Sequence, residues 1–235
     1  MEPIRILTLN IHKGFSPFAR KLVLHNLREA IRASKADLVF LQEVSGRSEL
    51  EQAEYLADEV WSDFAYARNA VFDDRHHGNA ILSRYAIGAH FNTDISSSRF
   101  EKRGFLYASI QTPTGNLHAI CLHLSLRSSD RKIQATALRR FVESLPKEEG
   151  LIIAGDFNDW SYRMREWVEA PLKLQEAFRF FHGKEAKTFP SYFPILSLDR
   201  VYTRGFSIKA AERFNHAEWP QLSDHLGLIV ELSGC

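Results

Sequence analysis

Short apolar runs bounded by polar residues recur along the whole chain. Runs of this kind, rich in aliphatic and aromatic residues, are typical of buried β-strands. We expect strands at residues 4–10, 37–42, 78–83, 87–91, 105–111, 117–123, 151–155, 198–202 and 226–232. Pro113 and Gly115 separate the fifth and sixth of these runs, which predicts a hairpin there.

Two longer segments instead carry apolar residues at the 3.6-residue period of a helix. These residues are Leu24, Leu27 and Ile31 within residues 20–34, and Ile133, Ala137, Phe141 and Leu145 within residues 129–145. Ser128 or Ser129 is the expected N-cap of the second helix, because a serine hydroxyl can accept a hydrogen bond from a free amide at a helix start. Residues 49–62 and part of 162–182 are also predicted to be helical.

The order of these elements indicates the fold class. Strands outnumber helices, both types are mixed along the chain, and several strands follow one another directly. This arrangement favours an α/β fold with two stacked sheets and helices on the outside. The 235 residues contain no repeat, low-complexity tract or linker, and they can bury one substantial core. We therefore expect residues 1–235 to form a single domain.

Polar side chains stand at the ends of many of the predicted strands. Asp156 and Asn158 follow the apolar run 151–155 at once, with only Phe157 between them. The same feature recurs at Asn10, Glu43, His123, Asp199, Asp224 and His225. Taken singly, each residue has an ordinary structural explanation, such as a turn, a helix cap or a hydrogen-bonded core histidine. Together they indicate a site, because strand ends in adjacent sheets can converge.

The residue types at these strand ends favour one class of chemistry. Carboxylates with an amide oxygen form a hard, all-oxygen site that suits Mg²⁺ or Mn²⁺. The sequence has no Cys/His cluster at zinc spacing, no phosphate-binding P-loop and no G-x-S-x-G motif. A hard cation beside a histidine and a carboxylate fits the hydrolysis of phosphate esters, in which water attacks phosphorus.

Composition narrows the class of protein further. The chain is 45% hydrophobic and 25% charged, with 30 Lys+Arg against 29 Asp+Glu and a formal net charge of +1. This balance excludes the basic footprint of a dedicated nucleic-acid binder, although a local basic patch still allows nucleic acid as a substrate. The 2 cysteines, together with the lack of a signal peptide or a membrane-spanning run, favour a cytoplasmic protein.

The motifs TLNI, LQEV, GNAILS, GDFND, LDRVY and SDHLG follow one another in this order along almost the whole chain. This set resembles the endonuclease/exonuclease/phosphatase (DNase I-like) superfamily, and it is most similar to compact bacterial members of uncertain substrate. The resemblance implies a four-layer α/β sandwich with two mixed β-sheets packed face to face and helices outside. It also implies hydrolysis of phosphoester bonds with Mg²⁺ or Mn²⁺ as cofactor.

The resemblance assigns roles to single residues. Glu43 would be the principal metal ligand, with Asn10 beside it, and Asp224 would reach the metal directly or through water. Asp156 would orient or deprotonate the attacking water, and Asn158 would hold the phosphate.

Three histidine and aspartate positions complete the implied site. His225 would bind a phosphate oxygen or act as general base, oriented by Asp199, and His123 would contact the phosphate and stabilise charge in the transition state. The resemblance leaves open whether Asp156 or His225 is the base, and whether one or two metals act. Arg103 is a candidate substrate-binding residue through its planar guanidinium, with a solvated loop arginine as an equal alternative.

Two further groups of residues have open interpretations. His76 and His77 are predicted to lie in a polar loop, because adjacent side chains point apart in extended chain and make a poor metal site. Several aromatic residues follow the chemical motifs, and they could stack on a base or cover a lipid or sugar. They are Trp160, Tyr162, Phe189, Tyr192 and Phe193. For these we favour a core position beneath a long loop.

We rank nucleic acid slightly above phospholipids and small phosphoesters as the substrate. A different function, a catalytically silent binding module with the same fold, would be expected to lack Glu43, Asp156 or His225. All three residues are present, which favours the enzyme.

Overall fold

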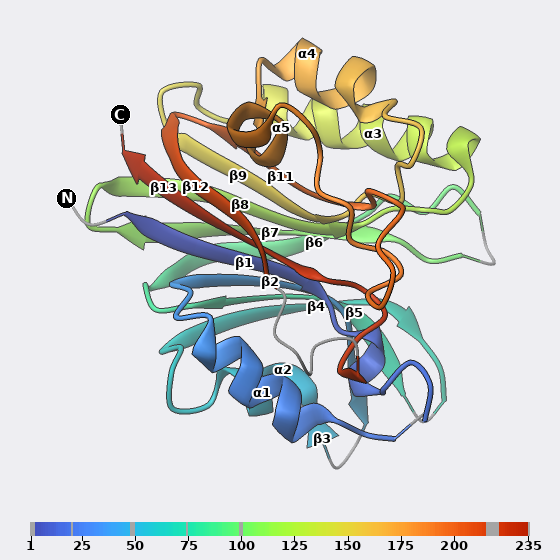
Figure 1. The fold of residues 1–235 in the computed structure, drawn as a ribbon. Coiled ribbons are helices and arrows are strands. Elements are labelled where there is room, and N and C mark those ends of the chain that lie inside the picture. Colours follow the sequence, from blue (N-terminus) through green and yellow to red (C-terminus); the bar gives the residue numbers. More distant parts are fainter. Residues whose placement is uncertain are drawn as a thin grey trace.

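The computed structural model describes residues 3–19, 21–47, 50–73, 75–98, 101–214 and 221–234. Two β-sheets pack face to face, and helices cover the outer surface of each sheet (Figure 1). Each sheet contains both parallel and antiparallel strand pairs. The four-layer α/β sandwich with two mixed sheets is therefore confirmed.

The first sheet has seven strands, and six of them form its continuous path. In spatial order these are β12 (Phe206–Phe214), β13 (Gly227–Gly234), β1 (Ile4–Asn10), β2 (Leu38–Arg47), β5 (His76–Ser83) and β4 (Asp63–Val71). The short strand β3 (Leu50–Glu51) pairs with β2 off this path. β1 and β2 run parallel, whereas the other pairs are antiparallel.

The second sheet has six strands, and its parallel pair lies at its centre. In spatial order the strands are β10 (Gln175–Glu176), β11 (Asp199–Arg204), β9 (Gly150–Asp156), β8 (Gly115–His123), β7 (Gly104–Thr112) and β6 (Ile87–Asp94). β8 and β9 are parallel, and β7 and β8 form the expected hairpin.

The helices divide between the two outer layers (Figure 1). The layer on the first sheet holds α1 (Leu24–Ala33) and α2 (Gln52–Ala57), and the 3₁₀ turn η1 (His12–Gly14) follows β1. The layer on the second sheet holds α3 (Ser128–Glu143), the π-helical turn η2 (Arg165–Glu169), α4 (Ala170–Leu172) and α5 (Ala177–His182). No helix in the described part of the chain is long and apolar enough to cross a membrane.

Three apolar layers hold these elements together. Ile152 and Phe40 belong to the layer between the sheets, whereas the neighbouring Ile153 packs with Leu138 of α3 on the outer side. Leu27 of α1 belongs to the third layer, against the first sheet. Alternate side chains of a strand point to opposite faces, so β9 supplies two cores at once and needs an unbroken apolar run.

Helix α3 differs in detail from its prediction. Ile133 was expected on the buried face, but its side chain is 58% exposed, whereas Leu138 and Val142 are fully buried. The N-cap position is Arg127 instead of Ser128 or Ser129, and no side-chain hydrogen bond from the described residues caps this end. The buried face also contains Arg131 and Gln134, which bond to the preceding loop. Because these two polar residues lie on the buried face, the apolar pattern of the sequence predicted the wrong face of α3 to be buried.

Four strands, β3, β4, β10 and β12, were absent from the prediction, and β5 was partly mistaken for a loop. β4 and β12 are the edge strands of the first sheet, and the buried positions of β4 are all alanine. Alanine gives little hydrophobic contrast and has low strand propensity, so the alternation is weak in the sequence. His76 and His77 lie in β5, where His76 is buried and its Nδ1 is 2.8 Å from the hydroxyl of Tyr66. Within the predicted helix 49–62, the described residues form the strand β3 and the short helix α2.

Candidate active site

The ends of four strands from the two sheets bring the polar residues together. In the first sheet, Asn10 at the end of β1 is in register with Gln42 of the parallel strand β2. In the second sheet, Asp156 at the end of β9 pairs with His123 on one side and with Asp199 on the other. Parallel neighbours end at the same edge of a sheet, and this places the predicted groups on one side of the sandwich.

Glu43 does not end its strand, contrary to the expectation. β2 continues to Arg47, and the register with β5 shifts between Leu41 and Val44. Glu43 lies in this bulge with φ of 56°. A bulge re-aims a side chain that regular alternation would send elsewhere. The left-handed backbone of Glu43 is strained for a residue with a Cβ, and such strain is common where a site fixes a side chain.

A cavity of about 240 Å³ opens where these strands end. Seven of the nine predicted residues line it, and they are Asn10, Glu43, Arg103, His123, Asp156, Asn158 and His225. Asp199 and Asp224 are not among the described residues that line the cavity.

Asp156 lies at the centre of the polar cluster and is buried. Its Oδ2 accepts a hydrogen bond from Asn10 Nδ2 at 3.2 Å, and it lies 3.3 Å from Nε2 of His123 and 3.8 Å from Nε2 of His225. Its Oδ1 accepts from the backbone N–H of Asn158 at 2.9 Å. Both oxygens are therefore held in place, as general-base or ligand chemistry requires.

His225 bridges two carboxylates. Its Nδ1 lies 2.9 Å from Oδ2 of Asp199, which is buried behind it, and its Nε2 faces Asp156. Burial lowers the pKa of His225, but the charges of Asp199 and Asp156 outweigh burial and raise its pKa to about 10. Burial raises the pKa of Asp156 to about 6, although the positive charge of His225 opposes this shift. His225 is thus a cation, and Asp156 an anion, at neutral pH.

His123 has the opposite electrostatics. Burial lowers its pKa well below the usual value, and the positive charges of Arg103 and His225 lower it further. His123 is therefore a neutral imidazole at neutral pH, with Nδ1 4.0 Å from Oε1 of Glu43. Arg103 lines the same cavity, and its Nη2 is 2.7 Å from Oε1 of Glu101.

Asn158 has the left-handed backbone, with φ of 48°, that asparagine tolerates better than most residues. Its Nδ2 donates to the backbone oxygen of Leu124 at 2.9 Å. An amide nitrogen carries two donor hydrogens, so this bond leaves one for another acceptor in the cavity.

The predicted metal ligands are only partly brought together. Asn10 Nδ2 lies 3.5 Å from Oε1 of Glu43, and its Oδ1 accepts from the backbone N–H of His12 at 3.0 Å. Asp224 stands next to His225 outside the cavity lining, and its buried Oδ1 has no hydrogen-bond partner among the described residues. The described groups whose ligand atoms lie within 4.8 Å of one another are instead Asp156, Asp199 and His225.

The donor set nevertheless fits a hard cation. Among the described residues, the nearest polar partners of the Glu43 carboxylate are Asn10 at 3.5 Å, Lys13 at 3.8 Å and His123 at 4.0 Å. None of these contacts is a short hydrogen bond, and the side chain of Glu43 is only 20% exposed. A half-buried carboxylate held this loosely, with the unpartnered oxygen of Asp224, leaves capacity for a cation.

The cavity also has an apolar side that was not predicted. It is formed by Leu126, Trp160, Phe189, Leu196 and Leu198. Trp160 is 44% exposed, and the buried guanidinium of Arg131 lies 4.7 Å from its ring centroid. The expectation that the aromatic residues form a core beneath a loop is wrong for Trp160, and also for Tyr162, Tyr192 and Phe193, which are 41%, 61% and 68% exposed. The position of Trp160 two residues after Asn158 was the available signal.

Comparisons with known proteins agree with this geometry. A model of the Endonuclease/Exonuclease/phosphatase family matches residues 7–225. The uncharacterized protein YbhP of Escherichia coli K12 is 44% identical over 241 residues, which cover 97% of this chain and 95% of that protein.

Solved structures share the fold at low sequence identity. An endonuclease/exonuclease/phosphatase from Beutenbergia cavernae superposes with a TM-score of 0.86 at 21% identity, covering 100% of this chain and 72% of that chain. TDP2 of D. rerio, complexed with single strand DNA product, gives a TM-score of 0.79 at 15% identity and covers 98% of this chain and 99% of that chain. With the family match over most of its length, this chain belongs to the endonuclease/exonuclease/phosphatase family, whose members are hydrolases of phosphoester bonds.

Proposed function

We propose that this protein is a divalent-metal-dependent phosphodiesterase that acts on nucleic acid. The observation that carries the proposal is the buried sequence of contacts from Asp199 through His225 to Asp156 at the wall of a polar cavity. It supplies a fixed base and a fixed cation side by side, which phosphoester hydrolysis requires. Both sheets contribute residues to the cavity, which favours one functional domain over residues 1–235.

Asp156 is the proposed general base. Its pKa of about 6 leaves it ionised at neutral pH yet basic enough to accept a proton from the attacking water. The backbone N–H of Asn158 and the amide of Asn10 orient its two oxygens. The high pKa of His225 argues against that histidine as the base, because it carries its proton at neutral pH.

His225, His123 and Asn158 are the proposed phosphate-binding groups. His225 offers a positive charge that Asp199 orients, and neutral His123 offers a hydrogen bond without an extra charge. The free amide hydrogen of Asn158 is a third donor. Arg103 would add a second cation at the cavity wall. Preorganised donors of this kind stabilise the additional negative charge that develops on the phosphoryl oxygens.

Mg²⁺ or Mn²⁺ is the proposed cofactor. Glu43 and Asn10 would hold it, with Asp224 contributing directly or through water. A bound divalent cation neutralises phosphate charge and favours attack by water. The loosely held carboxylate of Glu43 and the unpartnered oxygen of Asp224 support this assignment.

Nucleic acid is favoured as substrate by the aromatic and cationic side chains that meet at the cavity, since stacking on Trp160 suits a base and Arg103 suits a phosphate. The DNA complex of TDP2, which has the same fold, agrees with this choice. Phospholipids and small phosphoesters remain the alternative substrates, because exposed apolar residues such as Leu126 at the cavity would also suit an acyl chain. A binding module without turnover is the third possibility.

A substrate panel tests the proposal. Product release is measured with Mg²⁺, with Mn²⁺ and with EDTA on single- and double-stranded DNA, RNA, phospholipid vesicles, inositol phosphates and bis-para-nitrophenyl phosphate. His225→Ala is compared with the wild type, and His90→Ala serves as control because His90 is exposed on β6. We expect metal-dependent turnover that is lost in His225→Ala alone and is highest on nucleic acid. Turnover on phospholipid alone would contradict nucleic acid as the substrate. The absence of turnover on every substrate would contradict an enzymatic function.

A further inference from the structure

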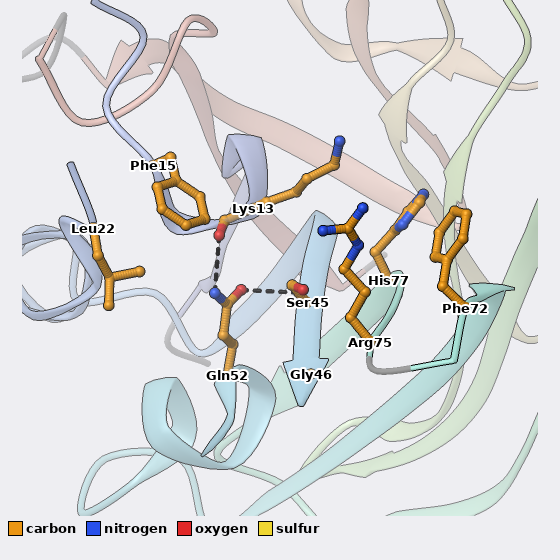
Figure 2. A pocket seen from close by; sticks show the side chains of 9 residues that line it. All are labelled: Lys13, Phe15, Leu22, Ser45, Gly46, Gln52, Phe72, Arg75 and His77. Atoms are coloured by element: carbon orange, nitrogen blue, oxygen red, sulfur yellow. Dashed lines mark hydrogen bonds between the residues drawn. The ribbon is translucent and has the colours of Figure 1, made fainter. Parts of the chain in front are cut away.

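A second pocket adjoins the candidate active site. It has a volume of about 330 Å³ and is lined by Lys13, Phe15, Leu22, Ser45, Gly46, Gln52, Phe72, Arg75 and His77 (Figure 2). The two cavities meet at an ion pair, because Lys13 lines this pocket, Glu43 lines the active-site cavity, and Nζ of Lys13 is 3.8 Å from Oε2 of Glu43. The second pocket therefore lies beside Glu43.

One wall of the pocket is a fixed group of cationic and aromatic side chains. The guanidinium of Arg75 lies 5.5 Å from the ring centroid of Phe72, and the imidazole of His77 stacks on that ring at 5.9 Å (Figure 2). Arg75 has no ion-pair partner in the described part of the chain, and its side chain is exposed. A guanidinium held against an aromatic ring without a carboxylate partner is available to an anion from the substrate.

The remaining walls show that the pocket is built, not a gap between loops. The buried side chain of Gln52 forms its floor and joins two elements, since Nε2 donates to the backbone oxygen of Lys13 at 2.9 Å and Oε1 accepts from the N–H of Ser45 at 2.8 Å (Figure 2). Opposite Arg75, Phe15 and Leu22 present apolar surface that is 37% and 55% exposed. A backbone bridge joins these two residues.

Several cationic side chains lie near this pocket, although the chain has a formal net charge of only +1. Burial lowers the pKa of His77, and Lys13, Arg103 and Arg75 lower it further, whereas Glu43 opposes them. Lys13, Arg103 and Arg75 are thus close enough to His77 to influence it, as is Glu43. A local positive field next to apolar and aromatic surface is the arrangement that binds single-stranded nucleic acid, whose phosphates need cations and whose bases need flat apolar contacts.

We propose that this pocket binds the nucleotide next to the scissile phosphate, with its phosphate held by Lys13 and Arg75 and its base packed against Phe15 and Leu22. This inference rests on the proposed function and names a single-stranded nucleic acid as the substrate class. A lipid headgroup would use the same cations, and the test separates the two.

Binding is measured first, without turnover. Fluorescence anisotropy of a labelled oligothymidylate is recorded at several salt concentrations, with every variant made in an Asp156→Asn background. We expect Arg75→Ala to weaken binding about tenfold and to reduce the slope of log affinity against log salt by about one, because one phosphate contact is lost. Phe15→Ala should weaken binding about fivefold or more with the slope unchanged, because a base contact is lost. Leu22→Ala is the milder variant of the same wall.

Matched controls come from the outer helices. Arg139→Ala removes a partly exposed arginine from α3, and Phe180→Ala removes a 59% exposed phenylalanine from α5. Neither should change affinity. Oligothymidylate binding that is unchanged in Arg75→Ala would overturn the proposal. Binding to anionic phospholipid vesicles is measured for the same variant, and a loss of vesicle binding alone would also overturn it.

Turnover separates this inference from the proposed function. Wild-type protein and Arg75→Ala are assayed on bis-para-nitrophenyl phosphate, which carries no adjoining nucleotide, and on the oligothymidylate. We expect Arg75→Ala to reduce kcat/KM at least about tenfold more on the oligonucleotide than on the small diester. Equal losses on both substrates would overturn the pocket's role. Failure of the wild type to cleave either substrate would refute the proposed function, while the anisotropy data would still decide whether the pocket binds nucleic acid.

Discussion

The Nδ1 atom of His225 lies 2.9 Å from Oδ2 of Asp199, and both side chains are buried. This bond orients the imidazole so that its Nε2 faces Asp156. It also keeps a proton on a histidine that burial alone would deprotonate. Because of this bond, His225 is the cation and Asp156 is the proposed base. The first prediction tests this assignment.

Asp199→Asn should move the alkaline limb of the pH profile. The pKa of His225 is about 10, so the cation is present below that pH and activity should fall as pH rises through about 10. Without the charge of Asp199 the pKa falls, and the loss of activity should begin at least about one pH unit lower. The measurement is kcat/KM from pH 5 to 11. An unmoved alkaline limb would show that another group controls it.

Asp156→Asn should abolish turnover without unfolding the protein. Loss of a general base costs about a hundredfold or more in kcat. The amide loses the hydrogen bond that Asp156 accepts from Asn10, but it also removes the cost of ionising a buried carboxylate whose pKa burial raises, so we expect the variant to fold. Thermal unfolding and kcat are measured together. A variant that loses activity because it unfolds would show that Asp156 is structural.

Asp159→Asn is the control for Asp156→Asn, because Asp159 is a buried aspartate three residues further along the chain that does not line the active-site cavity. The carboxylate of Asp159 accepts from the backbone N–H groups of Arg163 at 3.1 Å and Met164 at 2.8 Å. An amide would turn a donor toward one of these N–H groups and leave it unsatisfied, at a cost of about 1–3 kcal/mol. This variant should lose stability but keep its kcat when folded.

Glu43→Gln should weaken the metal dependence. The amide keeps the size of the carboxylate but removes its charge, so we expect the Mg²⁺ concentration for half-maximal activity to rise at least about tenfold. Titration calorimetry with Mg²⁺ gives a second readout that is independent of turnover. Glu54→Gln on α2 is the control, because Glu54 is exposed. An unchanged Mg²⁺ dependence would remove Glu43 from the metal site.

Gly155→Ala should displace Asp156. Gly155 has φ of 147°, and a Cβ there would lie 2.0 Å from the backbone oxygen of Leu122. β9 would have to move away from β8, which we expect to cost about 1–3 kcal/mol and to lower activity of the folded protein. Gly115→Ala is the matched control, because Gly115 also has positive φ but its Cβ would meet nothing within 4 Å. Equal effects of both variants would show that backbone strain alone is responsible.

Glu176→Gln should change how stability depends on pH. Burial raises the pKa of Glu176 to about 7, although the N–H groups of Arg179 and Phe178 that it caps oppose the shift. The pKa of Glu176 in the folded protein exceeds its unfolded value of about 4.3. The protonated carboxyl therefore stabilises the folded protein fully below about pH 4.3, and this stabilisation is lost as the pH rises through 7.

Glutamine does not titrate, so the comparison isolates this group. The free energy of unfolding of the wild type should fall, relative to that of Glu176→Gln, by on the order of 2–3 kcal/mol between pH 4 and 8. Urea unfolding of both proteins across this range is the measurement. Parallel curves would show that Glu176 has no raised pKa.

Strands that are buried on both faces were easier to predict from the sequence than edge strands. β9 was recognisable because both of its faces are buried and the run Leu151–Ala154 is wholly apolar. The edge strand β4 was not recognisable because alanines take its buried positions, and β12 was not because a register shift after Ile208 breaks its alternation. Helix α3 was found, but its buried Arg131 and Gln134 bond to the preceding loop through contacts that no periodicity reveals.

The chemical groups of the site were predictable one at a time. Asp156 and Asn158 stand out because a polar pair follows a buried strand directly. Arg75 and Phe72 carry no such signal, since an exposed arginine near a phenylalanine is common in any sequence, and only the fold sets them beside Lys13 and Glu43. The bulge that turns Glu43 likewise arises from pairing between β2 and β5.

The sequence by itself determined most of the buried strands and the polar side chains beside them, because local apolar runs mark both. Only the tertiary structure decided which of those side chains pair and which protonation state each one has. Asp199 and His225 are 26 residues apart in the chain, and their pairing, like the burial of Asp156, exists only when the two sheets are packed. A pKa depends on desolvation and on distances between charges, and both are properties of the folded state.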